Sequence, residues 1–358
     1  MAYVTLFDKN FKALGSNENF VGTQHITKSW SLKRRAFEFD DFTVTCRGFR
    51  DSKNACFVGL YSDEGKLKYV CFCGIPKTEN ELTTIAGIDC RNIFNQTLPV
   101  NLASSKITSL KSLYSFLLTT ALGNINVGIS YDVEFDDISD DTWNDPSLYI
   151  ERTLDARNIW TLIQSANALF DKIVVTSWRI DEDNNSYVLV FRVKNIKESM
   201  TIKLSDYDVR ATRTNNVTNI AIAATKDFSS SAMLYLTNDN EVLSVDKASG
   251  IDQAKALFPP KAETYTADTL EEAITSAKDA LYENRFMDRV VVDCNSRLGK
   301  RLEQMDLDWY GDLVGYNSAD DNSVKRLPVS AISEDSKGSK KIEFGRLSEY
   351  WFLNRKEK

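Results

Sequence analysis

Apolar and polar residues alternate in short runs through the first hundred residues, a pattern typical of β-strands. The runs cover residues 3–7, 25–32, 42–46, 56–61, 68–73 and 82–88. Asp63, Glu64 and Gly65 predict a hairpin turn between the fourth and fifth runs. Six short strands joined by tight turns indicate a small barrel or sandwich in this part of the chain.

A helical period replaces this alternation in the middle of the chain. Apolar residues recur at helical spacing over 108–122, with Gly123 as the expected stop, and again over 155–170. A strand is expected at 127–135. A hairpin is expected from 173–180 and 187–193 around 181–186. The middle therefore predicts an α+β region.

Strand patterns return after residue 200. They cover 201–204, 209–214, 217–223, a hairpin of 233–236 with 241–245, and stretches near Val290, Leu313, Leu327 and Ile342. One helix is expected at 270–282, because Thr269 and Glu272 form a capping box. The fold class is α+β, with two small β-barrel-like domains and intervening α/β domains. The expected parts are 1–100, 101–198, 199–347 and a charged tail at 348–358.

The segment 81–98 joins the first β-rich region to the middle. Its strand contains Gly87, and Asp89 follows at the position of a helix N-cap, with one or two helical turns expected at 91–96 and Ile93 and Phe94 turned inward. A strand, a glycine and a capped helix are common at nucleotide sites. The glycines that hold a phosphate are absent, so the segment indicates assembly in preference to chemistry. Considered with the whole chain, it is interpreted as the exit of a first barrel into a helix-bearing domain, with Gly87 serving backbone geometry in the strand.

The composition limits the possible functions. The chain has 358 residues, enough for two to four small domains, and a net charge of −7, which disfavours a surface built to hold a phosphate backbone but permits DNA in transit. No apolar run approaches the roughly 20 residues that span a bilayer. The start, MAYVTLFDKN, has no signal-peptide pattern, so synthesis in the host cytoplasm is expected.

The six cysteines are expected to be buried, reduced thiols. Cys71 and Cys73 lie two apart on one face of a strand, and no Cys-x-x-Cys motif is present. The alternative is a disulfide from Cys46 or Cys56 to Cys71 or Cys73.

Each candidate for chemistry has a plainer reading. His25, the one histidine, is expected in a strand without the partners of a catalytic triad. Asp181–Asn185 begins like a calcium loop, but Ser186 and Arg192 replace its required glycine and glutamate, so a hydrated hairpin tip is favoured. No catalytic, cofactor-binding or metal-binding residue is therefore assigned.

Charged and aromatic groups give further alternatives. A solvated loop is favoured for the acidic cluster of Asp136, Asp137, Asp140 and Asp141, with cation binding or a basic partner as the alternative. The basic run 33–35 reads as a solvated turn or a salt bridge to a partner, in preference to a nucleic-acid contact. The six tryptophans, Trp143 and Trp351 among them, fit core packing or subunit contacts as well as sugar stacking.

Several stretches together resemble a known family. They are 4–15, Trp30 with Phe37, Glu38, Phe42 and Val44, the passage 85–89 into 91–94, and the closing stretches 310–314, 328–332 and 342–345. In these the chain resembles the tail hub, or tail-associated baseplate hub, of long-tailed phages of Gram-positive bacteria. The match covers nearly the whole chain, and its motifs are fold patterns.

The resemblance implies a structural virion protein at the tail tip. Such hubs are homotrimers with two barrels per subunit, which form a pseudo-sixfold ring against the distal tail protein ring. They contact the tape-measure protein and the receptor-binding or baseplate components, close the tail tube, and open for DNA passage. Relatives with a wall hydrolase carry a long C-terminal extension, whereas this chain ends in a charged tail at 353–358. A carboxylate enzyme acting on cell-wall polymer and a carbohydrate-binding receptor module are the competing hypotheses.

Overall fold

The structure, a computed structural model, describes residues 2–14, 24–47, 54–99, 107–124, 130–136, 138, 156–181, 186–212, 218–237, 242–244, 261–284, 288–294, 299–316 and 324–345. The chain divides into two compact units, each described by itself. Unit 1 comprises Met1–Gln164, Lys172–Asn195 and Ala331–Lys340, and unit 2 comprises Ser165–Asp171, Ile196–Ser330 and Lys341–Lys358. The domain boundaries expected from the sequence remain a prediction.

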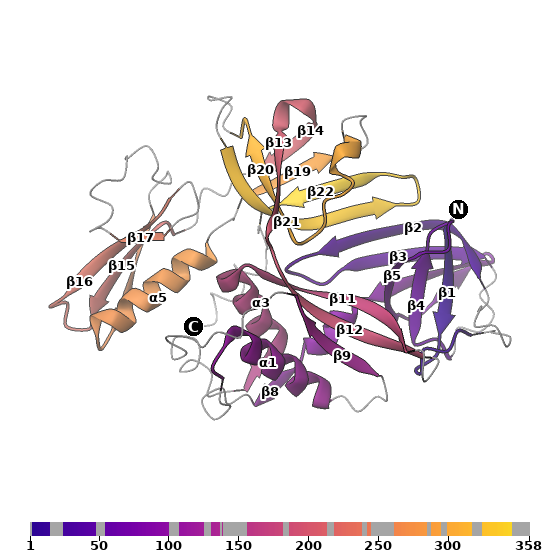
Figure 1. Ribbon diagram of the computed structural model, residues 1–358, viewed down its shortest axis with the longest axis horizontal. Helices are drawn as coiled ribbons and strands as arrows, with labels where there is room; N and C mark the ends of the chain where they lie inside the picture. Colours follow the sequence, from indigo (N-terminus) through magenta and orange to yellow (C-terminus); the bar gives the residue numbers. More distant parts are fainter. Residues whose placement is uncertain are drawn as a thin grey trace. The chain divides into compact units, whose positions relative to one another are not determined.

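The N-terminal sheet of unit 1 is built from six strands whose pairing returns to its starting strand (Figure 1). Besides its pairing with β4, β1 pairs with β2 through Tyr3 and Val4. The short β6 (Lys77–Glu79) adds to β7, and Ala331–Asp335 of β21 adds to β2. In order of pairing the six strands are β1 (Tyr3–Phe7), β4 (Phe57–Tyr61), β5 (Leu67–Cys73), β7 (Leu82–Ile88), β3 (Asp41–Arg47) and β2 (His25–Arg35).

Alternation along these strands creates the core. In β3, Phe42, Val44 and Cys46 are buried while their neighbours are half-buried or exposed, because successive side chains point to opposite faces. The inward faces of the other strands complete one apolar cluster, formed by Val4, Leu6, Leu32, Phe42, Val44, Cys46, Val58, Leu60, Tyr69, Cys71 and Ile85.

The rest of unit 1 is mixed. A short turn of 3-10 helix, η2 (Cys90–Phe94), follows β7, and β8 (Thr97–Pro99) then pairs with β10 (Ala156–Asn158). The hairpin of β11 (Lys172–Asp181) and β12 (Ser186–Asn195) pairs in parallel with β9 (Tyr131–Phe135). Helix α1 (Leu110–Asn124) belongs to unit 1, whereas α3 (Ile159–Phe170) begins in unit 1 and passes into unit 2 at Ser165.

Unit 2 contains a further set of paired strands, which belong to the 13-stranded sheet of the chain. The parallel pair β13 (Glu198–Lys203) and β20 (Trp309–Val314) joins the first half of β21 (Val324–Asp335). After β21, the strand order continues with β22 (Lys340–Phe344), β19 (Arg289–Asp293) and β14 (Asp208–Thr212). The turns η3 (Leu204–Asp206) and η5 (Gly299–Leu302) lie between these strands along the chain.

A smaller layer of unit 2 consists of one sheet and one helix, α5 (Leu270–Glu283), which lies along one face of the sheet (Figure 1). The capping box of Thr269 and Glu272 is present at the start of α5, as predicted. Ala273, Ala277 and Leu281 of α5 pack against alternate residues of the sheet. The strand order is β17 (Val242–Ser244), β16 (Ser231–Leu236), β15 (Ile220–Thr225) and β18 (Ala262–Ala267).

The structure corrects four expectations. Strand β2 continues to Arg35, so residues 33–35 are not a solvated turn. Residues 156–158 form a strand ahead of α3, which begins at Ile159. Helix α1 runs through Gly123 to Asn124, because a glycine inside a helix weakens it without ending it. Ile93 of η2 is only partly buried, while Phe94 is fully buried.

Candidate functional site

The segment between β7 and β8 forms the most connected polar site of unit 1. Asp89 caps η2 as predicted, and its Oδ1 accepts the backbone N–H of Arg91 at 2.8 Å. Phe94 fills the core side of this turn, with its ring centroid 4.7 Å from that of Phe191. Capping and burial together explain why a short helical turn forms directly after a strand.

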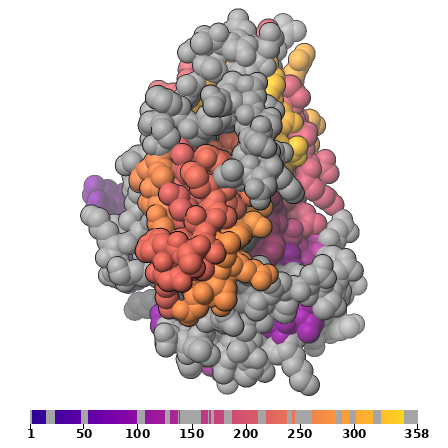
Figure 2. All heavy atoms as spheres, turned by 90° about the vertical axis from the view of Figure 1, so that its left-hand side faces the viewer, coloured from indigo at the N-terminus to yellow at the C-terminus, as the bar shows by residue number. Residues whose placement is uncertain are grey.

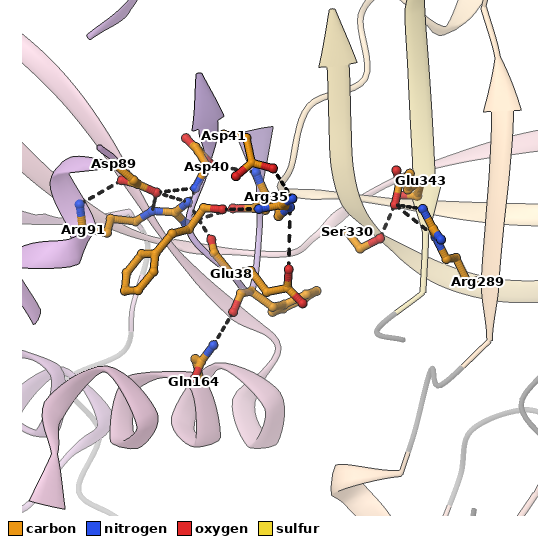
Figure 3. Close-up of polar contacts among 12 residues, drawn as sticks. Arg35, Glu38, Asp40, Asp41, Asp89, Arg91, Gln164, Arg289, Ser330 and Glu343 are labelled. Atoms are coloured by element: carbon orange, nitrogen blue, oxygen red, sulfur yellow. Dashed lines mark hydrogen bonds and ion pairs between the residues drawn. The ribbon is translucent and has the colours of Figure 1, made fainter. Parts of the chain in front are cut away.

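Arg91 is buried, with 1% of its surface exposed, and it binds two carboxylates (Figure 3). Its Nε and Nη2 donate to Asp89 Oδ2 at 2.9 and 2.6 Å, and Nη2 also donates to Asp40 Oδ1 at 2.7 Å. The backbone N–H of Asp40 returns a bond to Asp89 Oδ2 at 2.7 Å. The two carboxylates therefore compensate the burial of the guanidinium charge.

Three carbonyls complete the coordination of Arg91. Nη1 donates to the carbonyls of Arg35 at 2.9 Å and Val174 at 3.1 Å, and Nη2 donates to that of Glu38 at 2.8 Å. These groups belong to the end of β2, the loop after it and β11. The guanidinium has no N–H left for a ligand, so this Arg91 clamp is a structural junction and not an anion site.

The Arg91 clamp has unusual electrostatics because it holds two carboxylates and one cation. Burial raises the pKa of Asp40 to about 7, although the charge of Arg91 opposes the rise. Burial also disfavours the charge of Arg91, but Asp89 and Asp40 outweigh it and raise the pKa of that guanidinium. Trp160 covers the cation, with the guanidinium 5.6 Å from its ring centroid, and stacks on Phe39.

An aromatic hollow opens on unit 1 beside the β11–β12 hairpin. It is small, with free space for about one water molecule, and its lining residues are Phe7, Phe11, Tyr61, Leu67, Val70, Trp178 and Tyr187. Gly59 allows its close packing, because a Cβ there would lie 3.0 Å from Phe7 and 3.2 Å from Leu67 and Tyr61. The buried indole Nε1 of Trp178 makes no hydrogen bond to any of the residues that the structure describes. The hollow is too small for an apolar ligand and offers no catalytic side chain.

The acidic candidates are only partly covered by the described residues. Asp136 directly follows β9, and its carboxylate lies 3.6 Å from the guanidinium of Arg192. Arg192 also pairs with Glu134 of β9. Asp137, Asp140 and Asp141 lie outside the described residues. Asp181 and Ser186 face each other at the ends of the predicted β11–β12 hairpin, and residues 182–185 between them are not described.

The basic candidates are placed in strands. His25 begins β2 as predicted and is half-buried, and burial lowers its pKa. Arg35 pairs with Glu38 at 3.6 Å and with Asp41, and its Nη1 donates to the carbonyl of Phe39 at 2.7 Å. Arg35 is thus paired within its own chain, and a salt bridge from the basic run to a partner remains a prediction.

The cysteines and tryptophans fit packing roles. All six cysteines are free thiols, with Cys46, Cys71, Cys90 and Cys294 buried, so the disulfide alternative is wrong. Trp30 packs against the core of the N-terminal sheet. Trp143 and Trp351 lie outside the described residues.

Within the described ranges, no group of three or more His, Cys, Asp or Glu side chains is placed to hold a metal ion. No helix there is both long enough and apolar enough to cross a bilayer.

Comparison with known proteins identifies the fold. No protein-family model matches the chain, and no curated protein matches it in sequence. Among solved structures, the chain is similar to the 43 kDa tail protein of prophage MuSo2 from Shewanella oneidensis, with a TM-score of 0.55, 9% identity, and 97% of this chain and 99% of that chain covered.

Two further structures agree with this result. The prophage tail protein gp18 from Listeria monocytogenes EGD-e gives a TM-score of 0.53 at 10% identity, with 99% of this chain and 97% of that chain covered. A chain of the p2 virion baseplate in its activated conformation gives a TM-score of 0.50 at 10% identity, with 98% of this chain and 100% of that chain covered. The chain therefore has a mostly β fold that phage tail and baseplate proteins share.

The sequence reasoning missed both the Arg91 clamp and the aromatic hollow. It identified Asp89 as a cap but gave Arg91 no role. The available signal was a carboxylate and an arginine two residues apart in a segment whose neighbours are apolar. The hollow gave no signal, because its residues come from five separate strands and a turn.

Proposed function

We propose that this chain is a structural protein of a phage tail, the homotrimeric hub at the distal end of the tail tube. The observation that carries the proposal is the similarity of fold to phage tail proteins over 97–99% of this chain. Because a tail component needs shape and contact surfaces, a chain built around packing junctions suits this role. The hub acts without catalysis and resides in the virion.

The strand pairings support two barrel-like domains per chain. In unit 1 the pairing order closes through β1 and β2. In unit 2 the described pairings again involve six strands, β13, β20, β21, β22, β19 and β14. Two such sets of six strands in each of three subunits provide the six positions of a pseudo-sixfold ring. The domain limits at residues 100, 198 and 347 belong to this proposal.

The proposed partners follow from the hub role. The trimer meets the distal tail protein ring on one side and the receptor-binding or baseplate components on the other, and it contacts the tape-measure protein. The net charge of −7 allows DNA to pass without being held. The proposed host is a Gram-positive bacterium, as for the family that the sequence resembles.

The experiment that tests the proposal is native mass spectrometry of the full-length chain, alone and mixed with the distal tail protein of the same phage. We expect a species of three times the 40.5 kDa chain mass, and a complex of that trimer with the ring. A chain that stays monomeric and does not bind the ring at micromolar concentration would overturn the trimeric hub.

A further inference from the structure

The smaller layer of unit 2 is inserted between two strands that pair with each other. Strand β14 ends at Thr212 and β19 begins at Arg289, and these two residues lie directly opposite each other in the antiparallel pair. Two residues are enough to join antiparallel strands at such a position. The chain instead forms β15, β16, β17, β18 and α5 between them, and these four strands pair only with one another among the described strands. The layer is therefore an insertion at the turn of a hairpin.

The inserted module, defined as residues 218–284, has an apolar core of its own. The core joins one face of α5 to one face of the sheet, and each of its members is at most 2% exposed. All of these members lie within the module: Ala221, Ala223, Leu234, Leu236, Ala273, Ala277 and Leu281. Because segments as short as roughly 55–65 residues can fold alone around one core, the module is long enough for an independent fold.

The two ends of the inserted module are bonded to each other. The side-chain amide of Asn284, which follows α5, donates to the carbonyl of Thr218, which precedes β15, at 2.8 Å. Both residues are buried. Domains tolerate insertion into another fold when their two ends lie close together, because the host then needs no rearrangement. The closed ends of the module meet this condition.

Asn219 fixes the strand ends at the same side of the inserted module. Its N–H donates to the carbonyl of Lys261 at 3.0 Å, and its Oδ1 accepts the N–H of Lys261 at 2.9 Å. Its carbonyl accepts the N–H of Leu236, the last residue of β16, at 2.8 Å. Asn219 is 4% exposed, so these bonds satisfy polar groups that are shielded from water. The partners that hold this end of the module therefore belong to the module itself.

The inserted module also differs from the rest of the chain in charge. Residues 218–284 contain 11 Asp or Glu residues, 5 Lys residues and no Arg, so they account for nearly all of the net charge of −7. The described acidic side chains at its surface include Asp227, Asp268, Glu271 and Glu272. This layer, salmon and orange in Figure 2, lies at the surface in that view. The charge asymmetry makes the module distinct in composition as well as in packing.

We propose that the inserted module is an independently folding, acidic accessory domain and that the hub assembles without it. The first part follows from the separate core and the bonded ends of the module. The second part rests on the proposed function. If the strands β13, β14 and β19–β22 form the second barrel of the hub, that barrel needs only a short turn where the module is inserted. The contacts that build the ring are then made by the rest of the chain.

Hydrogen exchange of the full-length chain, measured on peptides by mass spectrometry, tests the first part. Ala277→Asp places a carboxylate in the core of the module, and Lys278→Asp is the matched control at an exposed position of the same helix. We expect Ala277→Asp to speed exchange at least tenfold in β15, β16 and α5, while β3 and β20 keep their protection. The control should change neither group. Equal loss of protection in both groups, or a module that stays protected in Ala277→Asp, would overturn independent folding.

A deletion variant tests the second part. Residues 213–288 are replaced by Asn-Gly, which joins Thr212 to Arg289 through a two-residue turn. In native mass spectrometry we expect three times the mass of the shortened chain, and affinity for the distal tail protein within threefold of the original. A deletion variant that is unfolded, or monomeric where the original chain is trimeric, would overturn the second part and leave the hub proposal standing. If the original chain is itself monomeric, the hub and the second part both fail, and hydrogen exchange still decides the first part.

Discussion

The Nε–H of Arg91 donates to Oδ2 of Asp89 at 2.9 Å, and both side chains are buried. Two residues apart in sequence, they join the end of one sheet to the strand β11 of another through the Val174 carbonyl. A buried pair of this kind does more to fix one arrangement of its neighbours than to add net stability. In the structural role that we propose, that fixed arrangement is part of the function.

Removing the cation from the Arg91 clamp should strongly destabilise the folded chain. Arg91→Met leaves the carboxylates of Asp89 and Asp40 buried and unpaired, and we expect the free energy of unfolding to fall by about 3–5 kcal/mol. Denaturant titration measures this. The control is Arg179→Met, because Arg179 is 54% exposed and pairs with Asp132 at the surface, where the loss should be at most about 1 kcal/mol. Equal losses in the two variants would contradict the role of the clamp.

Stability should depend on pH through Asp40. Its pKa is raised by burial to about 7 in the folded chain, against 3.8 as the ordinary value, so the folded state binds the proton more tightly than the unfolded state. The resulting stabilisation is complete below about pH 4 and is lost as the pH rises through 7. Asp40→Asn keeps an acceptor oxygen and removes the titration.

The measurement for Asp40 is unfolding by denaturant between pH 5 and pH 8. We expect the original chain to lose at least about 1 kcal/mol relative to Asp40→Asn over this range. Parallel stability curves for the two proteins would show that Asp40 keeps an ordinary pKa.

Two glycine-to-alanine substitutions should change the free energy of unfolding in opposite directions. In Gly87→Ala the new Cβ would lie 2.2 Å from Cys71 Sγ and 2.8 Å from Phe42 Cδ1, so we expect a loss of about 1–3 kcal/mol from overpacking. In Gly123→Ala the Cβ meets nothing within 4 Å and lies in α1, so we expect a gain of roughly 0.5–1 kcal/mol. Thermal unfolding of both variants measures the contrast, and a stabilised Gly87→Ala would contradict the packing around β7.

Phe11 and Phe228 both have a φ of 57°, in the left-handed region, but we expect substitutions at the two positions to change stability differently. Phe11→Ala removes a buried ring, and we expect a loss of about 3–5 kcal/mol. Phe228→Gly relieves positive φ without loss of core, so its stability should be unchanged or higher. A loss of stability in Phe228→Gly comparable to that of Phe11→Ala would show that Phe228 packs within its own chain.

The sequence predicted most elements because their signals are local. The alternation of β3, the capping box of α5 and the turn at Gly65 each depend on neighbouring residues, and the structure contains all three. Strand β18 was missed because Ala262–Ala267 mixes small and polar residues, and it forms only through parallel pairing with β15. The basic end of β2 was misread because its strand state comes from pairing with residues 331–335, three hundred residues away.

The candidate site was less accessible to sequence reasoning. Asp89 was identified through its local capping role, but the partners of Arg91 include Arg35, Glu38 and Val174, and only the tertiary fold brings these together. The hollow is likewise formed by residues from Phe7 to Tyr187. Contacts between distant parts of a chain leave no spacing that a single sequence reveals.

Immunogold electron microscopy of the intact phage, with an epitope tag on this chain, tests the central claim most directly. If the chain is a structural tail hub, gold particles should lie at the distal end of the tail on intact virions and be absent from capsids. Tagged chain recovered only free in the lysate, with unlabelled tails on infectious particles, would contradict the account.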